Sequence, residues 1–169
     1  SLGLPVASIG PSVASIYKRS LHLARSACIA VSQSGKSPDI VEMVRSARAS
    51  GALTCTFTND HTSPLAQLSN HCLPLYAGPE KSVAATKTFV TSIVSFIWLL
   101  AEWKNDQSLL KAIHDLPDFL EHSVQEFWPA LSNAVNNPGS LFCLGRGPTL
   151  AISNEAALKF KETCQLNAE

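Results

Sequence analysis

A short apolar run that ends in a polar turn and leads into a helix constrains the fold of this chain most. Residues 28–31 (Cys-Ile-Ala-Val) are apolar and stop at Ser-Gln-Ser-Gly, the pattern of a buried parallel strand that meets a turn. Pro38 suits the first position of a helix, and Gly51 suits its end. Residues 53–57 repeat the strand pattern. Strands that alternate with helices predict an α/β fold with a parallel sheet, whose ligands bind at the carboxyl ends of the strands.

The segments after residue 57 predict a third strand and long helices. Residues 72–76 fit a strand, and Pro74 favours an edge position because proline has no N–H for a ladder hydrogen bond. Residues 86–103 fit a long apolar helix, and residues 108–136 fit helical segments that break at Pro117.

The turn at residues 136–139 (Asn-Asn-Pro-Gly) is followed by a second copy of the opening pattern. Residues 141–144 fit a strand, and residues 145–147 (Gly-Arg-Gly) fit a glycine turn. A helix is predicted from there to the end of the chain.

Composition and charge exclude several classes of protein. Of the 169 residues, 46% are hydrophobic and 15% are charged, which excludes a disordered chain. The net charge is zero and no basic run occurs, so we expect no binding to nucleic acid. The uncharged stretch between Lys87 and Glu102 is shorter than the roughly 20 residues that span a bilayer, so we expect no membrane association. So little charge favours burial of surface between subunits, and we expect a homodimer.

The cysteines and the amino end indicate the compartment. The five cysteines form no C-x-x-C pair and mostly lie in short apolar runs, which is typical of buried free thiols in a reducing environment and argues against a metal site. The first residues lack the basic segment and apolar run of an export signal, so we expect a cytoplasmic protein. The cysteines are Cys28, Cys55, Cys72, Cys143 and Cys164.

The turn after the first strand is a candidate phosphate site. Three hydroxyls and an amide lie within six residues, directly before a helix N-terminus with its unpaired N–H groups. Such groups can bind a phosphate dianion without a metal, and the pattern calls for no cofactor. Serine and glycine are also ordinary turn residues, and Ser37 could simply cap the helix, so spacing leaves both interpretations open. A nucleotide P-loop is excluded because Ala30 occupies the position of its first glycine. The four residues are Ser32, Gln33, Ser34 and Ser37.

The last predicted helix carries a second candidate group. Glu155, Lys159 and Glu162 are spaced four and three residues apart, so they share one face. They could form a surface ion pair worth a few tenths of a kcal/mol. If that face lines a cleft, they could instead act as an acid and a base with pKa values that burial moves toward neutrality.

Three segments, in order along the chain, resemble the signatures of sugar isomerase (SIS) domains. Residues 30–39 resemble S-Q-S-G-x-[ST]-x-D, and residues 78–87 resemble G-x-E-x-x-V-A-[SA]-T-K. Residues 145–147 and 155–162 match the family's G-R-G and E-x-A-L-K-x-K-E segments. All three are similar to those of the isomerase half of glutamine–fructose-6-phosphate amidotransferases and of related glucosamine-6-phosphate deaminases.

The resemblance implies a domain organisation. The family joins two flavodoxin-like SIS domains, each a parallel sheet flanked by helices, in one chain. Residues 1–104 would then be a first SIS domain without its opening strand, residues 105–138 a helical connection, and residues 139–169 the first strand and helix of a second SIS domain. The family's ring-opening histidine and imine-forming lysine would lie after residue 169.

The resemblance also implies a role for each candidate residue. Ser32, Gln33, Ser34 and Ser37 would hold the sugar phosphate, and the backbone of Val83 would contact a sugar hydroxyl. Glu162 would move a proton between C1 and C2 through an enediol or enolamine, and Lys159 would assist with ring-oxygen or hydroxyl protons. Glu155 would hold the sugar or orient Lys159, while Glu80 and Lys87 would shape their loop.

The activity implied is that of an aldose–ketose isomerase for an amino-sugar phosphate, which requires no metal or other cofactor. Our first hypothesis is the deamination of glucosamine 6-phosphate to fructose 6-phosphate. The isomerase domain of an amidotransferase is an alternative, although this chain contains no amidohydrolase domain. A non-catalytic sugar-phosphate sensor is a second alternative, but a sensor would not need a base such as Glu162.

Overall fold

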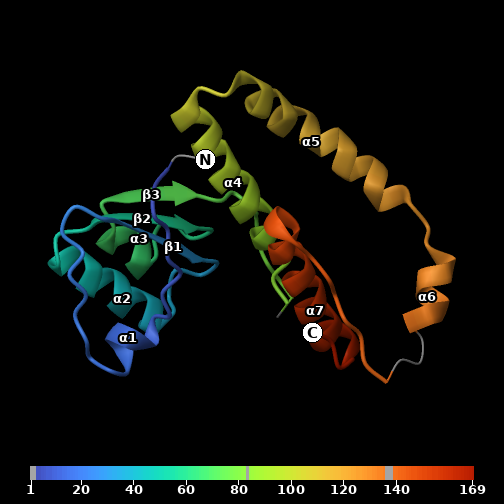
Figure 1. Ribbon diagram of the computed structural model, residues 1–169, viewed down its shortest axis with the longest axis horizontal. Helices are drawn as coiled ribbons and strands as arrows, with labels where there is room; N and C mark the ends of the chain where they lie inside the picture. The colour runs from blue at the N-terminus through green and yellow to red at the C-terminus, as the bar shows by residue number, and fades with distance from the viewer. Residues whose placement is uncertain (1–2, 83, 136–138) are drawn as a thin grey trace. The chain divides into compact units, whose positions relative to one another are not determined.

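The computed structural model describes residues 3–82, 84–135 and 139–169 (Figure 1). Val83, which the resemblance implies is a substrate contact, lies outside the described residues. The chain divides into two compact units, which are described separately. The first comprises Ser1–Lys81 and Ala85–Leu100, and the second comprises Ser82–Ala84 and Ala101–Glu169.

The first unit is built on a three-stranded sheet. Strands β1 (Ala27–Ser32), β2 (Leu53–Thr58) and β3 (His71–Pro74) are parallel and lie in the order β1-β2-β3. The prediction of an α/β fold with a parallel sheet is therefore confirmed, and so is the edge position of the strand that contains Pro74. Because the strands are parallel, all three end at the same edge of the sheet.

One face of the sheet packs against helices α2 (Pro38–Ala49) and α3 (Pro64–Leu68), as Figure 1 shows. A proline begins each helix, where its missing N–H costs nothing. The core of this face is a cluster of Ala30, Val41, Val44 and Leu65, of which Leu65 is fully buried. A short helix, α1 (Ser12–Ser15), contacts α2.

The opposite face of the sheet contacts helix α4 (Lys87–Lys104) through one aromatic pair. The Phe57 side chain is fully buried, and its ring lies 5.9 Å from that of Phe96, centroid to centroid. Val31 pairs with Phe57 in the register, so the two share this face, yet Val31 and Ile29 remain about half exposed. The described part of the chain therefore covers this face only in part.

The second unit consists mainly of helices α5 (Gln107–Gln125), α6 (Pro129–Val135) and α7 (Leu150–Cys164). The predicted break at Pro117 is wrong, because α5 continues through this residue to Gln125. Proline removes the hydrogen bond that its own N–H would donate to the carbonyl of Ile113, and its ring crowds that carbonyl, but the turns on either side remain helical. The carboxylate of Asp106 caps the start of α5 by accepting from the Leu109 N–H at 3.1 Å.

The end of the chain also differs from the prediction. Helix α7 stops at Cys164 because Gln165 is left-handed, with φ of 56°, so the predicted helix to the chain end is wrong. The chain then returns, and Leu141 forms an isolated parallel bridge with Ala168. In the described chain the predicted strand at residues 141–144 is reduced to this bridge, with hydrogen bonds that join residues 141 and 143 to residues 167 and 169.

Two further predictions concern the cysteines and the membrane. All five cysteines are free thiols, as predicted, but none is fully buried and Cys164 is exposed. Burial raises the pKa of the Cys28, Cys55 and Cys72 thiols. Among the described helices, none combines the length and the apolar character that crossing a membrane requires.

Candidate functional site

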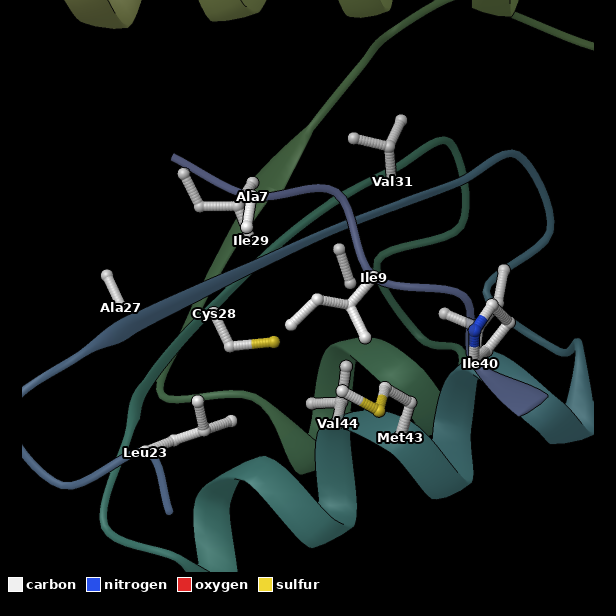
Figure 2. Close-up of a pocket in the computed structure, with 12 residues that line it drawn as sticks. Ala7, Ile9, Leu23, Ala27, Cys28, Ile29, Val31, Ile40, Met43 and Val44 are labelled. Atoms are coloured by element: carbon white, nitrogen blue, oxygen red, sulfur yellow. The ribbon is translucent and has the colours of Figure 1, made fainter. Parts of the chain in front are cut away.

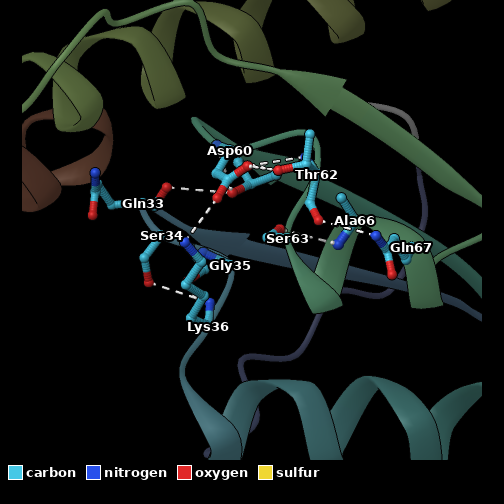
Figure 3. A network of polar contacts seen from close by, with 11 residues as sticks. Gln33, Ser34, Gly35, Lys36, Asp60, Thr62, Ser63, Ala66 and Gln67 are labelled. Carbon is cyan, nitrogen blue, oxygen red and sulfur yellow. Dashed lines mark hydrogen bonds and ion pairs between the residues drawn. The ribbon is translucent and has the colours of Figure 1, made fainter.

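The loop after β1 follows the end of the strand and leads into α2, and Figure 3 shows two of its predicted phosphate ligands, Gln33 and Ser34. The Ser32 hydroxyl is buried and accepts a hydrogen bond from the Gly35 N–H at 3.1 Å. The Ser34 hydroxyl accepts from the Lys36 N–H at 3.2 Å. Gly35 has a φ of 61°, and a Cβ atom there would lie 2.1 Å from the Ser63 hydroxyl, so only glycine fits. Side-chain and backbone contacts thus fix the course of this loop.

Ser37 occupies the N-cap position of α2, but its hydroxyl makes no capping hydrogen bond within the described chain. The interpretation that Ser37 serves simply as a cap therefore finds no support in its geometry. Its hydroxyl and the first N–H groups of α2 can face an anion together, and the helix dipole favours negative charge there.

Residues at the end of β2 and directly after it contact this loop through hydrogen bonds and an ion pair. The Asn59 N–H donates to the Gln33 carbonyl at 3.1 Å, and the Thr58 hydroxyl donates to the same carbonyl at 3.3 Å. The Lys36 ammonium lies 3.0 Å from the Asp60 carboxylate. The sequence analysis missed Thr58, Asn59 and Asp60. Their position at or directly after the carboxyl end of a parallel strand was the available signal, because such residues meet at one edge of the sheet.

Asp60 remains ionised and keeps Lys36 beside the loop. Its carboxylate accepts from the Thr62 hydroxyl at 2.6 Å and from the Thr62 N–H at 3.0 Å. The Thr62 hydroxyl, the Lys36 ammonium and the Thr62 N–H, in that order, lower the pKa of Asp60 to about 2. The ion pair between Asp60 and Lys36 therefore lies next to the serine-rich turn.

The loop after β3 is connected to the same edge. The Asn59 side-chain amide donates to the Gly78 carbonyl at 2.8 Å and accepts from the Ala77 N–H at 2.9 Å. The Glu80 carboxylate accepts from the Lys87 N–H at 3.1 Å, and the Lys87 ammonium donates to the Pro79 carbonyl at 2.6 Å. Glu80 and Lys87 thus shape the loop that precedes α4.

The second unit carries the other candidate group on α7. The Lys159 ammonium lies 2.9 Å from the Glu155 carboxylate and 3.5 Å from the Glu162 carboxylate. Side-chain exposure is 19% for Glu155, 23% for Lys159 and 37% for Glu162. Glu162 is therefore the more accessible carboxylate, and Glu155 holds the ammonium more closely.

The acid–base interpretation expected burial to move the pKa of Lys159 toward neutrality. The pKa is instead raised above its ordinary value. The hydrogen bond to Glu155 raises it most, and desolvation opposes this without outweighing it. Lys159 therefore remains an ammonium and can act as a cation and hydrogen-bond donor.

A cavity of about 310 Å³ lies between α2, β1 and the segment that precedes β1 (Figure 2). Its lining contains Ile9, Cys28, Met43 and Val44 and has no charged side chain. Such a lining does not suit a phosphate, so this cavity is not our candidate site. Among the described residues, no group of three or more His, Cys, Asp or Glu side chains is placed to hold a metal ion.

Comparison with known proteins identifies the class. The SIS domain family matches residues 12–102, which is more than half of the chain. The chain therefore belongs to the SIS domain family.

Relatives and solved structures agree with this assignment. The glutamine–fructose-6-phosphate aminotransferase (isomerizing) of Sulfolobus acidocaldarius is 32% identical over 160 residues, which cover 94% of this chain and 27% of that protein. A crystal structure of a proposed phosphosugar isomerase from Silicibacter pomeroyi is similar, with 59% identity and a TM-score of 0.95 over 99% of this chain and 51% of that one. The C-terminal domain of the glucosamine-fructose-6-phosphate aminotransferase from Francisella tularensis has 26% identity and a TM-score of 0.75, over 94% of this chain and 48% of that one. The chain thus spans about a quarter of the first relative and about half of each solved structure.

Proposed function

We propose that this protein is a sugar-phosphate aldose–ketose isomerase that acts on an amino-sugar phosphate. The observation that carries the proposal is the loop after β1, whose serine hydroxyls lie at the N-terminus of α2 in a backbone conformation that requires Gly35. Membership of the SIS domain family and the similarity to sugar-phosphate enzymes support it.

In this proposal the first unit binds the phosphate. The hydroxyls of Ser34 and Ser37 and the amide of Gln33 donate to the phosphate oxygens, together with the first N–H groups of α2. Ser32 supports the turn, because its buried hydroxyl accepts a hydrogen bond from the Gly35 N–H. Lys36 adds a positive charge close by, held by Asp60. The backbone of Val83 contacts a sugar hydroxyl.

The chemical step is a proton transfer by α7. The Glu162 carboxylate removes the proton from C2 of the open-chain sugar, and the C2 electron pair forms an enolamine with C1. The Lys159 ammonium stabilises the negative charge that develops on O1. Glu162 then returns the proton to C1, and the proton that the amino nitrogen gives up passes to O1, which leaves a hydroxyl on C1 and an imine at C2. Water hydrolyses this imine to the ketose and ammonia. Glu155 orients Lys159 through the 2.9 Å contact.

Two forms of the reaction follow from this chemistry. As a deaminase, the protein converts glucosamine 6-phosphate and water to fructose 6-phosphate and ammonia. As the isomerase domain of an aminotransferase, it runs the sugar step in the opposite direction with an amino group supplied by glutamine. The aminotransferase relatives favour this second form. A sugar-phosphate sensor of the same fold would bind the ligand without turning it over.

One experiment distinguishes these forms. The intact protein is incubated with glucosamine 6-phosphate alone, and in parallel with fructose 6-phosphate and glutamine. Ammonia release in the first reaction supports the deaminase, and glucosamine 6-phosphate in the second supports the aminotransferase. Binding of both sugars without either product would refute the enzyme proposal and leave the sensor.

The proposed organisation follows the same family. We propose that residues 139–169 begin a second SIS domain, that the protein is a cytoplasmic homodimer, and that it uses no cofactor. The return of the chain end to pair with Leu141 supports the start of a second parallel sheet. Analytical ultracentrifugation of the intact protein tests the dimer.

A further inference from the structure

Asn59 contacts both of the loops that the proposed function assigns to the substrate. Its backbone N–H donates to the carbonyl of Gln33. Gln33 lies in the loop between β1 and α2, which the proposed function assigns to the phosphate and which is called the phosphate loop below. The Asn59 side chain bonds the N–H of Ala77 and the carbonyl of Gly78, in the loop after β3. A single residue at the end of β2 therefore spans the exits of β1 and β3.

The chemistry of this contact requires an amide. An asparagine side chain presents one acceptor and one donor group in a fixed plane, which matches the N–H of Ala77 and the carbonyl of Gly78. An aspartate would keep the first bond but place a carboxylate oxygen against the Gly78 carbonyl. An alanine would lose both bonds.

The backbone of the loop after β3 needs such support. Tyr76 has a φ of 51° and Gly78 has a φ of 70°, so left-handed residues lie on both sides of Ala77. The left-handed conformation is unfavourable for tyrosine and persists only where surrounding contacts enforce it. The two hydrogen bonds of the Asn59 side chain hold the chain at Ala77, between these residues, and at Gly78 itself.

We propose that Asn59 is a positioning residue that fixes the loop after β3 so that it contacts the sugar while the loop after β1 holds the phosphate. This inference rests on the proposed function. The Asn59 backbone N–H bonds the Gln33 carbonyl without help from the side chain, so we expect the loop after β1 to stay in place when the side chain is changed. A side-chain substitution should therefore separate recognition of the sugar from recognition of the phosphate.

The test compares two probes, inorganic phosphate and fructose 6-phosphate, by calorimetric titration of the intact protein. Asn59→Ala is expected to weaken the binding of fructose 6-phosphate by about tenfold, the size expected for two lost hydrogen bonds. It is expected to weaken the binding of phosphate by less than about twofold. His61→Ala is the matched control, because this exposed residue lies on the same loop and makes no hydrogen bond or ion pair within the described chain. It should change neither affinity.

A second variant and a second measurement guard against misfolding. Asn59→Asp should selectively weaken the binding of fructose 6-phosphate. Its side chain should still protect the Ala77 N–H from hydrogen exchange, whereas Asn59→Ala should expose that N–H to exchange. Equal losses for both probes, or no loss beyond that of His61→Ala, would overturn the proposal. If the unaltered protein binds phosphate but not fructose 6-phosphate, or binds neither, the proposed function fails instead.

Discussion

Gly35 lies so close to Ser63 that a Cβ atom on the glycine would come within 2.1 Å of the serine hydroxyl. Ser63 is itself fixed, because it is buried and its hydroxyl accepts from the Ala66 N–H at the start of α3. The loop after β1 and helix α3 therefore meet at a point that has no room for a side chain. This contact sets the position of the loop relative to the helix behind it.

Gly35→Ala should destabilise the protein and weaken phosphate binding. The left-handed backbone costs a non-glycine residue about 1–2 kcal/mol, and the overlap with Ser63 adds about 1–3 kcal/mol. Gly147→Ala is the matched control, because Gly147 has a similar φ of 59° but open space around its Cβ position. Urea unfolding should show a larger loss for Gly35→Ala. Equal losses would mean that the overlap with Ser63 has no effect on stability.

Ser37→Ala should weaken phosphate binding with little change in stability. The Ser37 hydroxyl makes no capping bond in the described chain, so the folded protein loses no contact of this kind when it is removed. A lost hydrogen bond to a charged ligand corresponds to about 1.5–3 kcal/mol, or roughly tenfold or more in affinity. Calorimetric titration with inorganic phosphate measures the affinity, and Ser20→Ala, at an exposed serine, is the control. A stability loss without an affinity loss would restore a purely structural role for Ser37.

The Asp60 carboxyl should titrate near pH 2. Because its pKa is lowered from 3.8, its contacts with Thr62 and Lys36 stabilise the fold above about pH 4, and this stabilisation disappears as the pH falls toward 2. Thr62→Val and Lys36→Met should each raise the pKa, since the Thr62 hydroxyl and the Lys36 ammonium both lower it. Carbon-13 NMR titration of the Asp60 carboxyl measures the change in each variant. An unchanged pKa in either variant would mean that the group removed does not hold Asp60 in its ionised form.

The ammonium of Lys159 should titrate above its ordinary pKa of 10.5. The stabilisation from its partners is complete below that value and is lost as the pH rises through the raised pKa. Glu155→Gln should lower the pKa more than Glu162→Gln, because the Glu155 contact is 2.9 Å and the Glu162 contact is 3.5 Å. NMR titration of the Lys159 side chain gives the measurement. The reverse order would mean that Glu162, not Glu155, holds the ammonium.

The sequence predicted the parts of the fold that depend on local patterns. The apolar run at residues 28–31 and the polar turn after it determine a strand and its end, and Pro38 marks the start of α2. Pro117 misled the prediction, because a helix can lose one hydrogen bond and continue. The role of Asn59 could not be predicted from neighbouring residues, since its side-chain partners lie 18 and 19 positions away. Such contacts depend on the order of the strands in the sheet, which the local pattern does not specify.

Glu162→Gln should abolish turnover of the sugar phosphate while phosphate binding stays within about twofold. A neutral amide cannot remove the C2 proton, and loss of a general base typically lowers the rate by about 10²–10⁴-fold. Glu162 and the phosphate loop belong to different units of the chain, so the substitution should leave the loop unchanged. Glu121→Gln, at an exposed position of α5, controls for the loss of one negative charge. Retained turnover in Glu162→Gln would refute its role as the base, and equal loss in both variants would point to an effect of overall charge.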